Sequence, residues 1–151
     1  MSLAYVGLGA NLGPREITLL RAVDLLAATD GVEVRAVSQL RETEPVGVVE
    51  QPLFLNGAVA LDTSLSPREL LDRLLEIERG LGRVRDVRWG PRVVDLDLLV
   101  YGDLQIDEPG LRVPHPRLYE RRFVLEPLAE LDPDLEIPGY GLMSELLAAL
   151  D

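Results

Sequence analysis

The chain has 151 residues and a formal net charge of −11, with no cysteine, one histidine and arginine as its only basic residue type. This composition excludes disulfides, thiol catalysis, a multi-histidine metal site and a lysine-dependent Walker phosphate loop. No apolar run approaches the roughly 18 residues that span a bilayer, and the acidic charge argues against a nucleic-acid surface, so we expect one cytoplasmic domain over residues 1–151, monomeric and without a nucleic-acid or membrane partner.

The first predicted elements are a strand, a helix and a second strand. Residues 3–8 form the strand, and residues 7–13 form a turn whose glycine spacing does not fit a dinucleotide-binding loop. A helix then runs up to Gly31, because four apolar residues recur at helical spacing, namely Ile17, Leu20, Val23 and Leu26. Residues 32–40 form the second strand.

A loop and a third strand carry the first candidate binding residues. Residues 41–52 contain two prolines and a glycine without periodicity, which predicts a loop. In the strand over residues 53–61, Phe54 and Asn56 share the face opposite the aliphatic residues. A ring beside a carboxamide suits a flat, nitrogen-rich heterocycle. The alternative is that Phe54 is a core residue and Asn56 a ladder or turn residue.

A basic segment joins the second helix to a strand with two carboxylates. Residues 66–69 form a capping box that opens an amphipathic helix through Leu70, Leu71, Leu74 and Ile77, which ends at Gly80 or Gly82. Residues 83–92 then hold four arginines and one aspartate, and the strand over residues 92–100 follows. Alternation places Asp95 and Asp97 on one strand face and Val94, Leu96 and Leu98 on the other. The Cα atoms of the two aspartates are then about 7 Å apart. Such a pair suits one or two Mg²⁺ ions that also bind phosphate. The alternative is a solvated loop and two solvent-facing aspartates.

The last part of the chain predicts a hairpin and helical turns. Residues 104–113 form a short hairpin, Glu126-Pro127 breaks a helix, residues 132–140 are irregular, and residues 142–150 form a final helix. The element order strand, helix, strand, strand, helix, strand predicts an α+β, ferredoxin-like βαββαβ sandwich with C-terminal helical additions.

Several motifs resemble those of the 6-hydroxymethyl-7,8-dihydropterin pyrophosphokinase family. They lie in compatible order along nearly the whole chain, which makes them far more specific together than singly. They are Gly-Leu-Gly-Ala-Asn-Leu-Gly at residues 7–13, Thr-Glu-Pro-Val-Gly at 43–47, Gln-Pro-Leu-Phe-Leu-Asn at 51–56, the arginine-rich segment with Asp-Leu-Asp at 82–97, and Val-Pro-His at 113–115 followed by Arg-Arg-Phe at 121–123.

The resemblance implies a ferredoxin-like fold and transfer of a diphosphoryl group from ATP to 6-hydroxymethyl-7,8-dihydropterin, with AMP released, in folate biosynthesis. It implies Mg²⁺ ions on Asp95 and Asp97, with Arg83 and Arg92 also catalytic. The expected pterin-binding residues are Thr43, Pro45, Val46, Gly47, Phe54, Asn56 and Phe123. The expected ATP-binding residues are Glu78, Arg83, Arg85, Arg88, Trp89, Arg92, Leu98, His115 and Arg121.

Two other functions remain open at this point. A non-catalytic ferredoxin-like module could sense a small ligand and hold a structural ion. An RNA-binding module could use the arginines and Trp89, although the rest of the chain outside residues 83–92 carries a charge of −11 − 3 = −14. Formation of AMP from ATP and the pterin separates the enzyme from both.

Overall fold

The computed structural model describes residues 1–11, 13–43, 53–82 and 94–150. Its centre is an antiparallel sheet with the strand order β2-β4-β1-β5, and β3 pairs with β4 beyond the end of β2. The strands of this sheet are β1 (Ser2–Ala10), β2 (Val32–Val37), β3 (Arg41–Thr43), β4 (Phe54–Thr63) and β5 (Asp95–Tyr101). Helices and an antiparallel sheet in one fold confirm the predicted α+β class.

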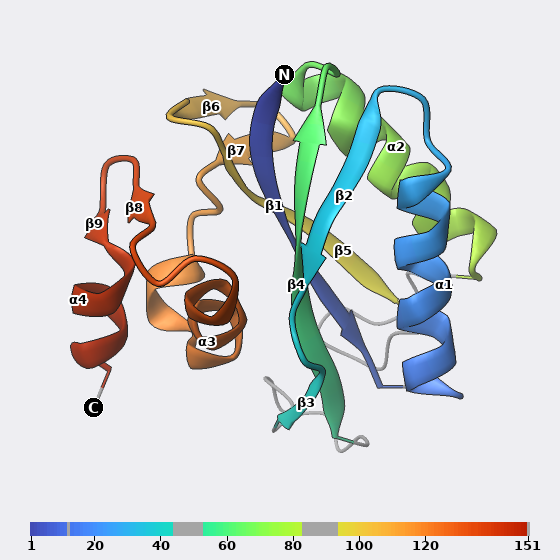
Figure 1. Cartoon of the computed structure of the whole chain (residues 1–151), viewed down its shortest axis with the longest axis horizontal. Coiled ribbons are helices and arrows are strands. Elements are labelled where there is room, and N and C mark those ends of the chain that lie inside the picture. Colours follow the sequence, from blue (N-terminus) through green and yellow to red (C-terminus); the bar gives the residue numbers. More distant parts are fainter. Residues whose placement is uncertain (12, 44–52, 83–93, 151) are drawn as a thin grey trace.

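Helices cover both faces of the sheet. The helices α1 (Arg15–Ala27) and α2 (Pro67–Gly80) lie on one face, and α3 (Arg122–Leu131) lies on the other (Figure 1). Each face has its own apolar cluster: Val6, Leu61 and Leu96 pack toward α1 and α2, whereas Tyr5, Ala60 and Val100 pack toward α3.

Small elements extend the fold after β5. The remaining elements are β6 (Ile106–Glu108), β7 (Leu111–Val113), a short 3₁₀ helix (Leu118–Glu120), β8 (Glu136–Ile137), β9 (Gly141–Leu142) and α4 (Met143–Ala148). The strands β6 and β7 form the predicted hairpin, and β8 with β9 forms a second one that the sequence did not reveal. No helix of the described ranges is long and apolar enough to cross a membrane.

The second helix follows its sequence signals. The Ser66 hydroxyl accepts a hydrogen bond from the Glu69 backbone N–H at 3.1 Å, and the Glu69 carboxylate accepts one from the Ser66 N–H at 2.9 Å. This reciprocal capping satisfies two N–H groups that the first helical turn leaves unpaired. Leu70, Leu74 and Ile77 are buried as predicted, and the helix ends at Gly80.

The buried face of α1 matches the predicted apolar stripe only in part, since Leu26 belongs to both. Ile17 and Leu20 are 61% and 48% exposed, whereas Leu19, Ala22 and Leu26 have no exposed surface. Apolar residues occupy more than one side of this helix, so a 3.6-residue period fits two faces equally well. The contacts with the sheet decide between them.

The predicted turn at residues 7–13 is wrong for its first half, because β1 continues to Ala10. Gly7 and Gly9 pair with both neighbouring strands, so sheet contacts override the usual preference of glycine for turns.

The strand predicted for residues 32–40 ends at Val37, and pairing resumes at Arg41, within the predicted loop. The Ser38 hydroxyl accepts a hydrogen bond from the Ala58 N–H at 2.9 Å, which takes the place of a ladder bond. A Cβ on Gly57 would lie 2.7 Å from Leu40 Cδ2, so Gly57 gives the side chain of Leu40 its space at this break.

Pro127 lies inside α3, so the predicted break at Glu126-Pro127 is wrong. A proline in a helix interior costs about 3 kcal/mol through a lost hydrogen bond and steric strain. Leu125 and Leu128 are fully buried against the sheet, and each contributes about 1.5–3 kcal/mol. Burial therefore outweighs the cost of the proline.

Candidate functional site

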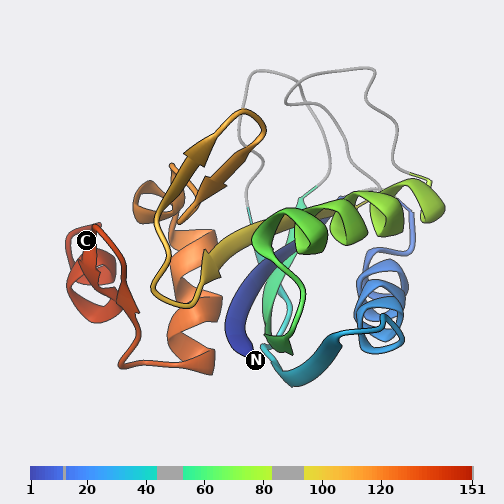
Figure 2. The same ribbon diagram turned by 90° about the horizontal axis from the view of Figure 1, so that it is seen from above.

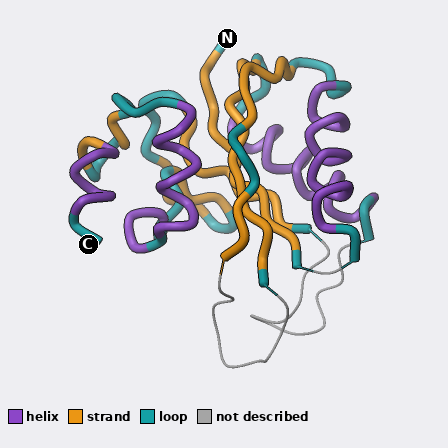
Figure 3. The backbone as a smooth tube through the Cα atoms, turned by 60° about the horizontal axis from the view of Figure 1, so that its bottom comes forward, coloured by secondary structure: helices purple, strands orange, loops and turns teal. Residues whose placement is uncertain are grey.

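The candidate site lies on the α3 face of the sheet, at the end where β1 finishes and β4 and β5 begin (Figure 3). Gly9 pairs with Asn56 on one side and with Asp95 on the other, and Gly7 pairs in the same way with Ala58 and Asp97. Cross-strand partners share a face. The carboxylates and the carboxamide therefore belong to one surface, separated by a strand whose residues have no side chains there.

Gly9 leaves space for the carboxamide of Asn56. A Cβ on Gly9 would lie 2.9 Å from Asn56 Nδ2, closer than real Cβ atoms approach, and 3.9 Å from Phe54 Cδ1. Glycine is therefore required by close approach in an extended strand rather than by a turn.

Asn56 is held by two neighbours and is only 9% exposed. Its Oδ1 accepts a hydrogen bond from the Thr43 hydroxyl, and its Nδ2 donates to the Leu8 carbonyl at 3.4 Å. An amide group has two donors and two lone pairs, so these two contacts orient the carboxamide and, as far as the described residues go, leave one donor and one acceptor for a ligand. The pairing of β3 with β4 brings Thr43, Phe54 and Asn56 together, as the sequence predicted.

Phe123 comes from α3, on the same side of the sheet. The Arg121 guanidinium lies 5.7 Å from the centre of the Phe123 ring, within the range of a cation–π contact. Phe54 and Phe123 are both half-buried, so each ring presents some surface to solvent.

A pocket of about 520 Å³ lies beside β5. It is bounded by α2, β5, the β6–β7 hairpin and the segment after it, and Figure 2 shows α2 and the hairpin both next to β5. Four of its lining residues were predicted to bind ATP or metal: Glu78, Asp97, Leu98 and His115. The other lining residues are Leu71, Leu75, Leu96, Gly110, Leu111, Arg112 and Pro116.

Sequence reasoning did not assign Leu75, Leu111 and Arg112 to a site, and it treated Leu71 only as part of the buried helix face. A signal was present in α2, where Leu71, Leu75 and Glu78 follow helical spacing beside the buried stripe. Leu71 and Leu75 are half-buried and line the pocket, and Leu71 also packs against the core cluster, so this second apolar stripe lies at the border between the core and the pocket.

Glu78 is 4% exposed and accepts a hydrogen bond from the Leu96 backbone N–H at 2.7 Å. This contact ties the end of α2 to the start of β5, next to Asp95 and Asp97. Glu78 therefore holds α2 to β5 at the wall of the pocket, in addition to its predicted role in ATP binding.

His115 contributes a neutral imidazole to the pocket. Burial, with Arg121 and then Arg117 nearby, lowers the pKa of His115 from 6.5 to about 4. The Nδ1 atom accepts a hydrogen bond from the Arg117 N–H at 3.3 Å, so the proton of the neutral ring resides on Nε2. The backbone N–H of His115 donates to the Leu99 carbonyl at 2.8 Å and fixes this segment to β5.

The lowered pKa of His115 predicts an acid-sensitive contribution to stability. Between 6.5 and about 4 the unfolded chain binds more protons at this residue than the folded chain. The contribution is therefore full above 6.5 and is lost as the pH falls toward about 4. We expect wild type to lose more unfolding free energy than His115→Gln between about pH 7 and about pH 5, measured by urea unfolding. Equal losses would contradict a buried neutral imidazole.

The carboxylate pair fits a hard divalent cation. Asp95 is half-buried and Asp97 is exposed, and both project from the same face of β5. Within residues 1–11, 13–43, 53–82 and 94–150, no group of three or more metal-binding side chains occurs. Mg²⁺ commonly takes one or two carboxylates and completes its octahedron with water and phosphate oxygens, so a pair is a sufficient donor set.

The remaining predicted site residues lie outside the described residues. These are Pro45, Val46, Gly47, Arg83, Arg85, Arg88, Trp89 and Arg92. Their assigned roles stay predictions.

The fold and the site define a small α+β protein in which a carboxylate pair lies between an aromatic and carboxamide surface and an adjacent pocket. The family model for 7,8-dihydro-6-hydroxymethylpterin-pyrophosphokinase (HPPK) matches residues 5–133. The chain belongs to this family.

Curated relatives are similar in sequence to this chain over most or all of its length. The 2-amino-4-hydroxy-6-hydroxymethyldihydropteridine pyrophosphokinase of Methylorubrum extorquens is 50% identical over 151 residues, which cover 100% of this chain and 95% of the relative. The proteins of the same name from Pseudomonas aeruginosa and Bacillus subtilis are 48% and 51% identical, covering 96% and 89% of this chain and 90% and 81% of the relatives.

Solved structures agree in fold. The Plasmodium falciparum HPPK-DHPS wild type with pteroate has a TM-score of 0.77 at 14% identity, covering 98% of this chain and 42% of that chain. The chain thus spans less than half the length of that structure, and at this identity the likeness shows the fold alone.

Proposed function

We propose that this chain transfers the diphosphoryl group of ATP to the hydroxymethyl group of 6-hydroxymethyl-7,8-dihydropterin, releases AMP, and so performs a step of folate biosynthesis. The family and the names of relatives near 50% identity support this activity. One observation supports assigning the activity to this site. Through the cross-strand partners Gly9 and Gly7, Asp95 and Asp97 lie between Asn56 and the pocket.

The finer fold assignment belongs to the same proposal. Residues 1–151 act as one pyrophosphokinase domain with a ferredoxin-like βαββαβ core and C-terminal helical additions. The sheet order β2-β4-β1-β5, with α1 and α2 on one face, supports it. The chain acts as a cytoplasmic monomer without a nucleic-acid or membrane partner, in keeping with a net charge of −11.

The pterin ring is held by Phe54 and Phe123, and its polar edge is bound by Asn56 with Thr43 and residues 45–47. The fixed carboxamide of Asn56 supports this role, because a donor and an acceptor on one rigid group match the alternating nitrogen and carbonyl edge of a pterin. Orientation by Thr43 and Leu8 lowers the ordering cost of binding.

ATP occupies the pocket beside β5. The apolar stripe of α2 and Leu98 suit the base, and neutral His115 donates a hydrogen bond from Nε2 without adding positive charge. Glu78 and Arg121 complete the described part of this site. The arginines at 83, 85, 88 and 92, with Trp89, contact the nucleotide, and Arg83 and Arg92 neutralise charge on the phosphates at transfer.

Asp95 and Asp97 would hold the Mg²⁺ ions, which would supply charge neutralisation at the phosphates. The protein brings the hydroxymethyl oxygen and the β-phosphorus together from opposite sides of the carboxylate pair. Positioning of this kind removes much of the entropic barrier to a reaction between two bound substrates.

Gly9 provides a test of the pterin site. Gly9→Ala places a Cβ 2.9 Å from Asn56 Nδ2, which is too close, and is therefore expected to displace the carboxamide. Loss of one or two hydrogen bonds at about 1 kcal/mol each lowers the affinity for a pterin analogue about tenfold. Gly80→Ala is the control, since a Cβ there meets no atom of the described residues within 4 Å. Calorimetry that found equal pterin affinity in both variants would contradict the assigned role of Asn56.

Formation of AMP tests the activity. Purified protein is mixed with ATP, Mg²⁺ and the pterin alcohol, and nucleotides are separated by chromatography, with omission of the pterin or of Mg²⁺ as controls. We expect AMP only in the complete mixture. Tight ligand binding without AMP would instead favour a non-catalytic binding module.

A further inference from the structure

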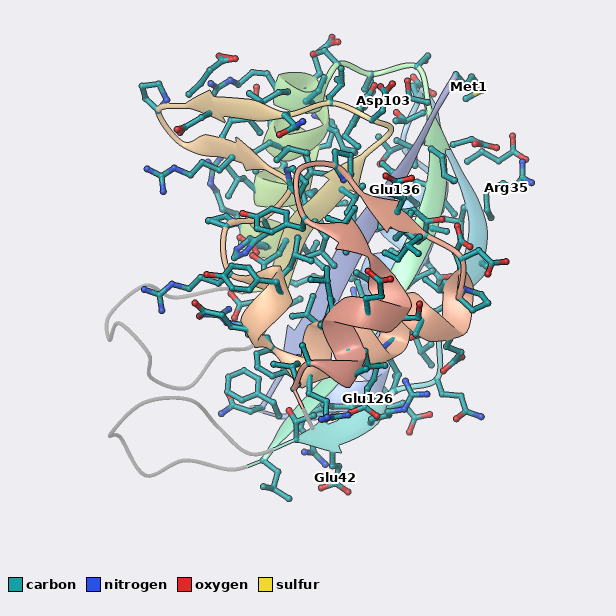
Figure 4. The ribbon with its side chains drawn as sticks, turned by 90° about the vertical axis from the view of Figure 1, so that its left-hand side faces the viewer. Met1, Arg35, Glu42, Asp103, Glu126 and Glu136 are labelled. Carbon is teal, nitrogen blue, oxygen red and sulfur yellow. The ribbon has the colours of Figure 1, made fainter. Side chains whose placement is uncertain are left out.

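The pterin site is assembled from two parts of the fold. Thr43, Phe54 and Asn56 come from β3 and β4, and Phe123 comes from the start of α3. Figure 4 looks toward α3, with Glu126 of that helix and Glu42 of β3 labelled near the same end of the molecule. The strand β3 has three residues and, within the described part of the chain, pairs only with β4. So short an edge strand needs further contacts to stay in place.

One carboxylate joins β3 to α3. Glu130 Oε1 accepts a hydrogen bond from Arg41 Nη2 at 2.6 Å, and Glu130 Oε2 accepts one from the Gln39 backbone N–H at 2.8 Å. The two carboxylate oxygens of Glu130 therefore bind the segment just before β3 and the first residue of β3. Charge-assisted bonds of this length are among the stronger polar contacts in proteins.

The Arg41–Glu130 ion pair is less exposed than the ion pair between Arg112 and Asp107. Its side chains are 36% and 31% exposed, compared with 63% and 83% for the Arg112–Asp107 pair. Arg41 Nη1 is enclosed and has no hydrogen-bond partner among the residues that the structure describes. Enclosing a donor without a partner costs free energy of desolvation. The hydrogen bonds of the other guanidinium nitrogens must offset this cost, so the position of Arg41 depends on them.

Arg41 is also next to the pterin residues. It is the cross-strand partner of Asn56, and Thr43, two residues further along β3, donates its hydroxyl hydrogen bond to Asn56 Oδ1. Residues two apart in a strand share a face, so Arg41 and Thr43 both project toward α3. The contact between Arg41 and Glu130 therefore also sets the position of the Thr43 hydroxyl, which orients Asn56.

We propose that the Arg41–Glu130 ion pair is a positioning device for the pterin, which holds β3 against α3 so that Thr43 and Asn56 stay in register with Phe123. Arg41 acts through Thr43 and Asn56 rather than by touching the substrate. The proposal rests on the proposed function, since the pterin is the ligand of this surface.

Steady-state kinetics of Arg41→Met test the proposal. Loss of the ion pair frees β3, so KM for the pterin is expected to rise about tenfold while KM for ATP and kcat stay within about twofold. Arg41→Lys keeps a cation and is expected to restore most of the pterin affinity. The control is Arg35→Met, which breaks the 2.5 Å ion pair between Arg35 of β2 and Asp62 of β4 and should leave both KM values unchanged.

A purely structural ion pair would lower the melting temperature of Arg41→Met without a change in pterin KM, and that result overturns the proposal. If Arg41→Met does not fold, Glu130→Gln keeps the shape and an acceptor for Gln39. A rise of about threefold in pterin KM is then expected, and an unchanged value overturns the proposal. Failure of the proposed function is a separate outcome, because wild type would then produce no AMP.

Discussion

Asp97→Asn is expected to lower kcat by about a hundredfold or more, which corresponds to about 2.7 kcal/mol of transition-state stabilisation. The substitution keeps the shape of an exposed side chain on β5 and removes one negative charge from the carboxylate pair. Charge that develops on the transferred group is stabilised mainly in the transition state, so turnover falls more than nucleotide binding. Steady-state kinetics at saturating ATP and Mg²⁺ give this value.

Asp103→Asn is the matched control for Asp97→Asn. Asp103 is exposed in the turn directly after β5, toward the opposite end of the strand from Asp95 (Figure 4), so its substitution changes the net charge equally but leaves the site intact. If the aspartates of β5 were only solvent-facing residues, Asp97→Asn would relieve repulsion, raise the melting temperature slightly and leave kcat unchanged. An unchanged kcat would therefore contradict the metal assignment.

Phe54→Ala and Phe123→Ala are expected to weaken pterin binding far more than ATP binding. Each ring loses about 1.5–3 kcal/mol of apolar burial if fully covered by the ligand, and stacking adds about 0.5–1.5 kcal/mol. A loss of 2.7 kcal/mol or so is about a hundredfold in affinity. Calorimetry with a pterin analogue and with ATP gives the two affinities separately.

Tyr140→Ala serves as the control for the aromatic substitutions. Tyr140 stacks on Tyr119 with ring centres 5.3 Å apart, and both rings lie outside the proposed pterin site. The same truncation of a stacked ring should leave both affinities unchanged there. Equal losses for pterin and ATP in the phenylalanine variants would show that the two rings do not flank the pterin.

The elements predicted well are those whose residues carry local signals. The capping box at Ser66 and Glu69 satisfies helix N–H groups without help from the rest of the fold, so the start of α2 was predictable. Alternation in β5 correctly placed Asp95 and Asp97 opposite Val94, Leu96 and Leu98, which pack in the cluster toward α1 and α2.

The elements predicted wrongly depend on contacts between distant residues. The sequence around Gly9 predicts a turn, because the close approach of its cross-strand partner Asn56 is visible only in the structure. Pro127 stays helical because neighbouring leucines are buried against the sheet. The buried face of α1 could not be chosen because apolar residues surround much of that helix.

The same distinction applies to the site. The sequence predicted that Phe54 and Asn56 share a face, which follows from strand alternation alone. It could not predict the pocket, because Leu71 and Leu75 become lining residues only through the position of the β6–β7 hairpin beside α2 and β5. The sequence also could not predict the hydrogen bonds from Arg41 and Gln39 to Glu130, because they join residues about ninety positions apart.

The most direct test of the account is identification of both products by ³¹P NMR after a single turnover with ATP, Mg²⁺ and 6-hydroxymethyl-7,8-dihydropterin. Transfer of the diphosphoryl group predicts pterin diphosphate and AMP in equal amounts, with both strongly reduced in Asp97→Asn. Formation of ADP with a pterin monophosphate, or no phosphorylated pterin at all, would contradict it.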